Sequence, residues 1–155
     1  GMVFATLHVV GSANNLRLPG EFAARNRANL AWLRQTFALA RERRAPGVAF
    51  FMQADPLFER PPARRKGFQA LIEALAAEAR AFPGQVLLVH GDSHRYQTDR
   101  PLSGAGVPNL LRVIVFGGAD VHGVRLGVDP ASPGLFSPSP FIVWKNTLGA
   151  AADGR

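Results

Sequence analysis

The sequence predicts a single α/β domain, residues 1–155, in which a mixed β-sheet or sandwich is flanked by two helices. Three short apolar runs, Val3–Val10, Val48–Met52 and Val86–Val89, are typical of buried strands. Two longer segments with apolar residues at helical spacing lie between them, at about residues 21–44 and 67–81. The alternation of strand and helix favours parallel strands joined by helical crossovers.

The second half of the chain predicts β-hairpins instead of helices. Its apolar segments Arg112–Phe116, Val121–Val128 and Phe141–Trp144 are separated by turns rich in glycine and proline. Residues 117–120 are predicted to form a hairpin connection. Residues 146–155 are small and polar, which predicts a frayed tail.

The composition limits the classes of function. Without cysteine, disulfides and thiolate-bound zinc are excluded. The apolar runs are too short to span a membrane and no signal peptide is visible, so the chain as encoded is expected in the cytoplasm. The net charge of +7 comes mostly from arginine and is attributed to an arginine-rich proteome. The basic segment 59–66 lacks aromatic residues for base stacking, so nucleic acid is not expected and polyanion binding is the weaker alternative.

Polar side chains follow the predicted third strand. His90, Asp92 and His94 lie within five residues of one another, directly after Val89. Ligands in α/β proteins bind where strands end, so Asp92 and His94 are candidate metal ligands. The alternatives are that Asp92 caps its own turn and that His94 is a loop histidine. His90 is expected to support a neighbouring group, because it lies on the strand side of the turn.

Further candidate ligands and contacts are expected at the same ends of the strands. Gln53 and Asp55 follow the second strand, and they would add oxygen ligands if the two strands are neighbours. Arg95 follows the cluster directly and is a candidate phosphate contact, since a guanidinium suits that geometry.

With QADP after the second strand and HGDSH after the third, the chain resembles the C-terminal half of calcineurin-like metallophosphoesterases, in particular a bacterial subgroup with segments like HVVGSANN, QADP and HGDSHRY. Members of that family are four-layer α/β/β/α sandwiches that hold two metal ions at strand ends and hydrolyse phosphate esters. Their last metal motif is Gly-His-x-His. Residues 91–94 stand in its place, so the resemblance implies Asp92 and His94 as ligands, with Asp92 replacing the first histidine.

The family's other metal motifs, Asp-x-His, Gly-Asp-x-x-Asp and Gly-Asn-His-Asp/Glu, are absent ahead of the third strand. The resemblance therefore implies a truncated or degenerate member without efficient hydrolase activity of its own. One divalent metal, Mn, Fe, Zn or Mg, would be weakly bound or absent. The alternative is that the true start lies upstream of Met2. The full product would then be an ordinary dinuclear hydrolase, and its location could be periplasmic or secreted.

A different class of function is also predicted. Half of a sandwich leaves a sheet face or edge uncovered, and such surfaces promote self-association. The alternative to a hydrolase is therefore a non-catalytic interaction module that forms a homodimer or a larger homo-oligomer.

Overall fold

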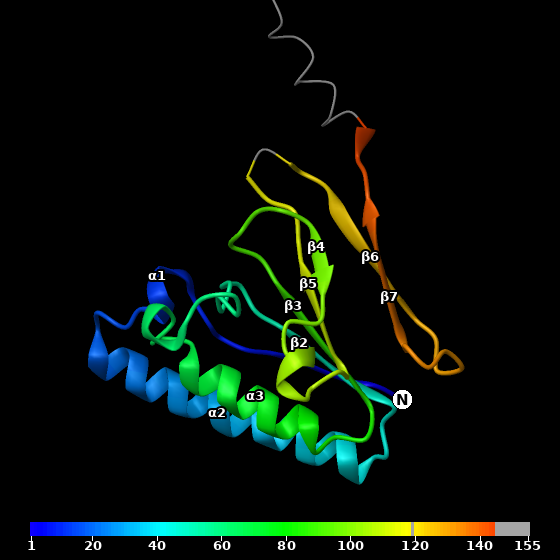
Figure 1. Cartoon of the computed structure of the whole chain (residues 1–155), viewed down its shortest axis with the longest axis horizontal. Helices are drawn as coiled ribbons and strands as arrows, with labels where there is room; N and C mark the ends of the chain where they lie inside the picture. Colours follow the sequence, from blue (N-terminus) through cyan, green and yellow to red (C-terminus); the bar gives the residue numbers. More distant parts are fainter. Residues whose placement is uncertain (119, 145–155) are drawn as a thin grey trace, which may run out of the picture.

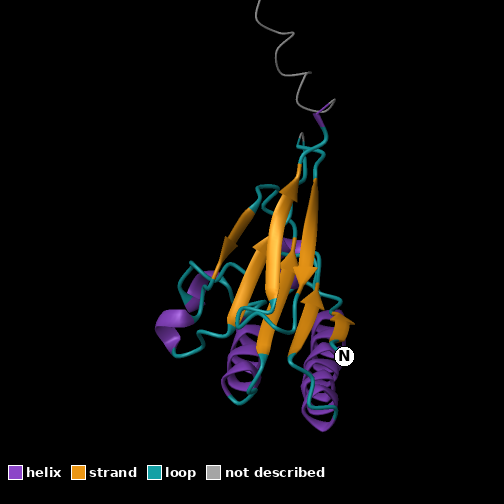
Figure 2. Ribbon diagram, turned by 90° about the vertical axis from the view of Figure 1, so that its right-hand side faces the viewer, coloured by secondary structure: helices purple, strands orange, loops and turns teal. Residues whose placement is uncertain are grey.

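The computed structural model describes residues 1–118 and 120–144 and shows three layers (Figure 1). A five-stranded mixed sheet has helices packed on one face and a two-stranded hairpin on the other. Figure 2 turns that hairpin toward the viewer. The predicted mixed α/β class with a mixed sheet is confirmed, and a second sheet of two strands accompanies it.

The elements follow in the order strand, helix, strand, helix, strand, and then strands with no α-helix between them among the described residues. The strands are β1 (Val3–Thr6), β2 (Gly47–Phe51), β3 (Gln85–His90), β4 (Gln97–Asp99), β5 (Leu110–Ile114), β6 (Gly123–Val128) and β7 (Phe136–Phe141). The helices are α1 (Gly11–Asn14), α2 (Pro19–Glu42) and α3 (Gln69–Arg80), with short 3₁₀ turns η1 (Pro62–Arg64) and η2 (Ser103–Ala105).

The sheet order is β1-β2-β3-β5-β4. The first four of these strands are parallel, and β4 pairs antiparallel with β5 at one edge. The predicted helical crossovers between parallel strands are therefore confirmed. Because the strands are parallel, the loops that follow β1, β2 and β3 all lie at the carboxyl ends of the strands. This end of the sheet carries the candidate site.

The apolar residues divide between the two faces of the sheet as strand alternation requires. On the helix side, Phe37 of α2 and Leu75 of α3 are buried against residues such as Phe50. On the hairpin side, Ala49 and Leu87 pack with Phe136. The central strands β2 and β3 are thus covered on both faces, which explains why their sequences are continuous apolar runs.

Four strand predictions are wrong in their bounds, one of them only because β6 begins at Gly123 instead of Val121. The strand expected at Val3–Val10 ends at Thr6, because the backbone of His8 is bonded to the side chain of Asn29 instead of to a neighbouring strand. The strand expected at Phe141–Trp144 instead spans Phe136–Phe141. The strand expected at Arg112–Phe116 begins and ends two residues earlier.

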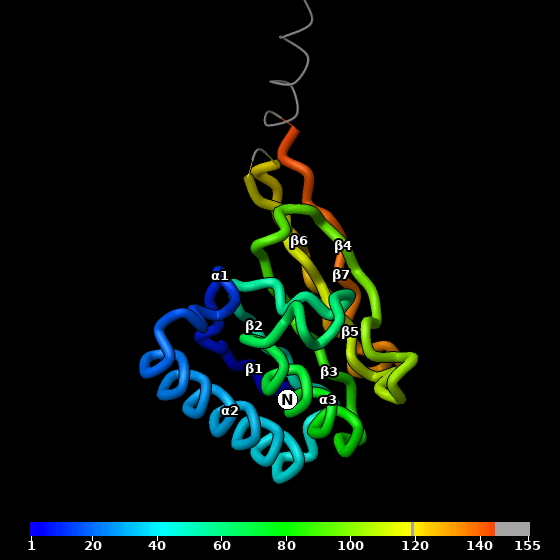
Figure 3. Tube along the Cα trace, turned by 60° about the vertical axis from the view of Figure 1, so that its left-hand side comes forward, coloured from blue at the N-terminus to red at the C-terminus, as the bar shows by residue number. Residues whose placement is uncertain are grey.

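The segment that joins β2 to α3 crosses the helix-side face of the sheet. In Figure 3 this teal-to-green segment extends from β2 toward β4 and β5 before it returns to α3. Phe58 is buried within it and lies under the guanidinium of Arg112, 5.4 Å from the ring centre. The predicted exposed connection at 59–66 therefore contains one turn of 3₁₀ helix and follows a buried anchor.

No helix among the described residues is long and apolar enough to cross a bilayer. The predicted frayed tail, 146–155, lies outside the described residues.

Candidate functional site

Gln53, Asp55, Asp92 and Ser93 meet where β2 and β3 end. The Gln53 side-chain amide donates a hydrogen bond to Asp92 Oδ1 (3.4 Å), and the Asp55 backbone N–H donates one to Asp92 Oδ2 (3.4 Å). Ser93 Oγ donates a short hydrogen bond to the Asp55 carboxylate. β2 and β3 are neighbours, and these contacts place Gln53 and Asp55 beside Asp92; their role as oxygen ligands stays a prediction. Ser93 is an addition that the sequence pattern did not single out.

The loop after β1 closes the same site from a third strand. The Gly11 N–H donates a hydrogen bond to Gln53 Oε1 (2.9 Å). A Cβ atom on Gly11 would lie 3.5 Å from each oxygen of the Asp92 carboxylate. The backbone of this loop therefore passes directly over the carboxylate, so the site is built from the ends of three neighbouring strands.

His90 lies fully buried beneath this cluster. Its Nδ1 is 3.0 Å from the carbonyl oxygen of Gly91, so the tautomer with a proton on Nδ1 donates to that carbonyl. Its Nε2 has no hydrogen-bond partner and lies 4.0 Å from Asp55 Oδ1. Burial lowers the pKa of His90, so the ring is neutral at pH 7 and presents an unshared lone pair toward Asp55.

His94 and Arg95 make no hydrogen bond with the carboxylate cluster among the described residues. The His94 backbone is left-handed (φ 59°), and its ring packs on Gly117 and Gly118, where an added Cβ would come within 3.0 Å. No hydrogen bond joins His94 to Asp92 among the described residues. Arg95 instead lines a hollow that also contains Asp55 and Ser93.

The donor set can be compared with what a metal centre requires. Within residues 1–118 and 120–144, no group of three or more His, Cys, Asp or Glu side chains is placed to share one ion. Asp55 and Asp92 supply carboxylate oxygens, the ligand type of a hard cation such as Mg²⁺ or Mn²⁺, whereas Gln53 Oε1 already accepts a hydrogen bond from the Gly11 N–H. These residues do not fit a two-metal centre.

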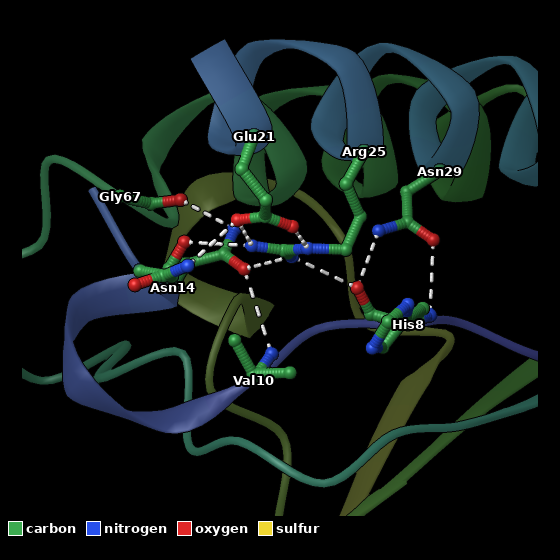
Figure 4. Close-up of polar contacts among 8 residues, drawn as sticks. His8, Val10, Asn14, Glu21, Arg25, Asn29 and Gly67 are labelled. Carbon is green, nitrogen blue, oxygen red and sulfur yellow. Dashed lines mark hydrogen bonds and ion pairs between the residues drawn. The ribbon is translucent and has the colours of Figure 1, made fainter. Parts of the chain in front are cut away.

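A second network fixes the loop that passes over Asp92 (Figure 4). Residues Ser12 to Asn15 are all left-handed, with φ between 53° and 57°. Arg25 of α2 donates to Asn14 Oδ1 (2.6 Å), to the Asn14 carbonyl (3.0 Å) and to the His8 carbonyl (3.0 Å). Four consecutive left-handed residues are costly in L-amino acids. Side-chain contacts of this kind are what make such a turn stable.

Asn14 and Glu21 complete this network. Asn14 is fully buried, and its side-chain amide donates to the Gly67 carbonyl just before α3 (2.9 Å). Glu21 accepts from Arg25 Nε (2.5 Å) and Nη2 (3.0 Å). The sequence signal for this clamp is the i,i+4 pair Glu21–Arg25 on the first turns of a predicted helix, which by itself indicates only a surface pair.

Glu21 gives the clamp a measurable pH dependence. The hydrogen bond from Arg25 holds the pKa of Glu21 at about 2, below its ordinary 4.5. Between these values the unfolded chain binds more protons, so this contribution to stability is complete above about pH 4.5 and is lost as the pH falls toward 2. In Glu21→Gln, the midpoint of urea unfolding is expected to fall less than in the wild type as the pH is lowered over that range. An equal fall in the variant and the wild type would contradict this prediction.

Comparison of the chain with models of known families, with curated proteins and with solved structures found no match. The resemblance to calcineurin-like metallophosphoesterases therefore stays a prediction from the residues.

Proposed function

We propose that this chain is a truncated or degenerate metallophosphoesterase-like domain that binds one divalent cation weakly and does not hydrolyse phosphate esters efficiently alone. The observation that carries the proposal is the meeting of Asp55 and Asp92 at the carboxyl ends of β2 and β3. In this proposal the helices, the five-stranded sheet and the hairpin correspond to the C-terminal half of a four-layer α/β/β/α sandwich.

The chemistry of the site explains both parts of the proposal. Phosphoester hydrolysis by two-metal enzymes needs ions that polarise the phosphoryl group and supply a hydroxide. Asp55 and Asp92 together carry two negative charges, which balance one divalent ion. Asp55 also accepts hydrogen bonds from Ser93 and from the Leu57 N–H (2.8 Å), so part of its ligand capacity is occupied. The residues present would thus hold one cation and leave hydroxide formation without a second metal.

The chain's own residues have distinct roles in such a site. Asp55 and Asp92 would hold the cation, and Gln53 orients Asp92 through its amide. Neutral His90 faces Asp55 from below without adding positive charge. The backbone of Gly11 limits access from the β1 side.

Titration of the full chain with Mn²⁺ tests the cation site. Asp92→Asn and Asp55→Asn are each expected to weaken binding by at least about tenfold, because each removes a charged ligand. His94→Ala is expected to change the affinity little, since its ring contacts Gly117 and Gly118. Asp129→Asn, in the β6–β7 turn, is the matched control. Equal affinity in Asp92→Asn and wild type would refute the site.

Turnover of p-nitrophenyl phosphate and bis-p-nitrophenyl phosphate tests the second part. The purified chain with Mn²⁺ is expected to show no turnover above that of Asp92→Asn. Metal-dependent turnover that is lost in His94→Ala would contradict the proposal and would favour an intact hydrolase.

A second candidate function, self-association, is favoured by the surface around β1. Within the described part of the chain, this strand lies at one side of the sheet and pairs with β2 alone. Phe4 is 56% exposed and Trp32 of α2 is 50% exposed, and both line a hollow of about 170 Å³. The hollow's lining contains no charged residue, so two copies would meet there without repulsion despite the chain's net charge of +7. The proposed occupant is therefore a second copy of this chain.

Light scattering at micromolar concentration tests this candidate. Wild type is expected to be a dimer, and Phe4→Glu is expected to be a monomer because it places like charges on both copies. Val128→Glu, an exposed apolar residue on β6, is the control and should leave the dimer intact. A monomeric wild-type mass would refute self-association.

A further inference from the structure

A hollow of about 360 Å³ adjoins the carboxylate cluster on the side of β4. One wall comes from the segment after β2 and carries Asp55, Glu59 and Arg60. The other comes from the segment after β3 and carries Ser93, Arg95 and Gln97. We call it the arginine pocket. Its size is at the lower end of the range for pockets that hold small molecules, about 300–1,000 Å³.

The acidic residues that line the arginine pocket have hydrogen-bond partners, whereas its two arginines do not. Glu59 is bonded to the fully buried Arg112, whose single positive charge is shared with Asp99. Asp55 is held by Ser93. The guanidinium groups of Arg60 and Arg95 make no hydrogen bond or ion pair within the described part of the chain. The hollow is thus lined by two exposed arginines without partners, one from each segment, and by two acids that accept hydrogen bonds from Ser93 and Arg112.

Polar groups beneath the same walls also lack partners. Arg112 is fully buried, yet its Nη1 makes no hydrogen bond while its Nη2 reaches Glu59. His90 Nε2 is likewise unpartnered beside Asp55. Buried polar atoms without partners are uncommon and call for an explanation such as a ligand or an ordered water. Here both belong to residues that do not line the pocket themselves but lie against two of its lining residues, Asp55 and Glu59.

We infer that the arginine pocket binds a small molecule through a phosphate or carboxylate group held between Arg60 and Arg95. A guanidinium presents several donors in a planar fork that matches either oxyanion. Ser93 and Gln97 offer further hydrogen bonds, and Leu57 and Ile114 give the pocket an apolar part for the carbon skeleton.

The pocket is coupled to the proposed cation site through Asp55, which belongs to both. A cation at Asp55 and Asp92 would cancel negative charge at the pocket wall and strengthen binding of an oxyanion. The effect of the cation on oxyanion binding rests on the proposed function. The binding of an oxyanion by Arg60 and Arg95 does not depend on it.

Calorimetric titration of the full chain with inorganic phosphate, glycerol 3-phosphate and succinate tests the inference, first with a chelator and then with Mg²⁺. Binding of at least one ligand is expected, and the ligand that binds identifies the oxyanion. Arg60→Ala and Arg95→Ala are each expected to weaken it by about tenfold, through loss of a charge-assisted hydrogen bond. Arg34→Ala, an exposed arginine of α2, is the control. Circular dichroism of each variant checks that it is folded.

The outcomes separate this inference from the proposed function. If an oxyanion binds with the chelator present and depends on both arginines, the pocket stands even when Mg²⁺ and Mn²⁺ do not bind. If the cation binds at Asp92 but no ligand binds with or without it, the pocket is refuted and the cation site stands. Oxyanion binding that Arg60→Ala, Arg95→Ala and Arg34→Ala weaken equally would also overturn the inference, because it would show only a general charge effect.

Discussion

Arg112→Met is expected to lower the free energy of unfolding by about 3 kcal/mol, because it removes one partner of a buried ionic network. Arg112 is fully buried on β5. It donates to Asp99 through Nε (2.8 Å) and Nη2 (2.6 Å), and it also bonds Glu59. Burial alone would lower the pKa of Arg112, but the hydrogen bonds with Asp99 and Glu59 raise it, so its charge persists at all ordinary pH values.

The substitution affects two parts of the structure. Asp99 ties β4 to β5, and Glu59 ties the segment after β2 to the same strand. Methionine keeps most of the apolar stem that packs against Phe58, so the loss reports chiefly the polar contacts. Asp99 and Glu59 are partly exposed and regain water, which keeps the expected loss at the lower end of the range for buried pairs.

Urea unfolding followed by circular dichroism measures this effect. Arg34→Met on the exposed face of α2 is the matched control and is expected to stay within about 0.5 kcal/mol of wild type. If Arg112→Met and Arg34→Met have equal unfolding free energies, the Arg112 network does not stabilise the fold.

The central part of the fold could be predicted from the sequence because its strands are buried on both faces. Val48–Met52 and Val86–Val89 are predicted as strands, and β2 and β3 lie at Gly47–Phe51 and Gln85–His90. Both helices follow from the spacing of residues such as Phe37 and Leu75. Continuous apolar runs and helical spacing can be recognised in a sequence without knowing which elements pack against one another.

The hairpin could not be predicted with the same accuracy. β7 contains Pro138 and Pro140, which argue against a strand, yet both lie opposite β6 residues at alternate positions. In a two-stranded ribbon, alternate residues direct their N–H groups away from the partner, so proline costs no ladder hydrogen bond there. β4 has only three residues and no apolar pattern, and its position is explained instead by the bond between Asp99 and Arg112.

The candidate site was predictable to the extent that it depends on strand order. Asp55 and Asp92 follow parallel neighbours, so their proximity follows from topology. The position of His94 depends on one left-handed backbone conformation, which turns its ring toward Gly117 and Gly118. The clamp around Asn14 depends on a run of left-handed residues that no periodic pattern indicates.

Arg25→Met is expected to lower the free energy of unfolding by about 2 to 3 kcal/mol, because bonds to a charged group in a nearly buried site are lost together. The Arg25 side chain is only 9% exposed and bonds His8, Asn14 and Glu21. Without it, the left-handed turn keeps the buried side chain of Asn14 but loses its main donor. Each left-handed residue costs about 1–2 kcal/mol, so the turn is expected to open locally before the domain unfolds.

Hydrogen–deuterium exchange distinguishes this local opening from a general loss of stability. Amides of residues 8–15 are expected to exchange faster in Arg25→Met than in wild type under native conditions, while those of β3 keep their relative protection. Because Gly11 approaches Asp92 and donates to Gln53, the same variant is expected to bind Mn²⁺ more weakly. Arg34→Met again serves as the control. If Arg25→Met loses stability but residues 8–15 stay protected, Arg25 supports only the start of α2 and does not hold the loop over the site.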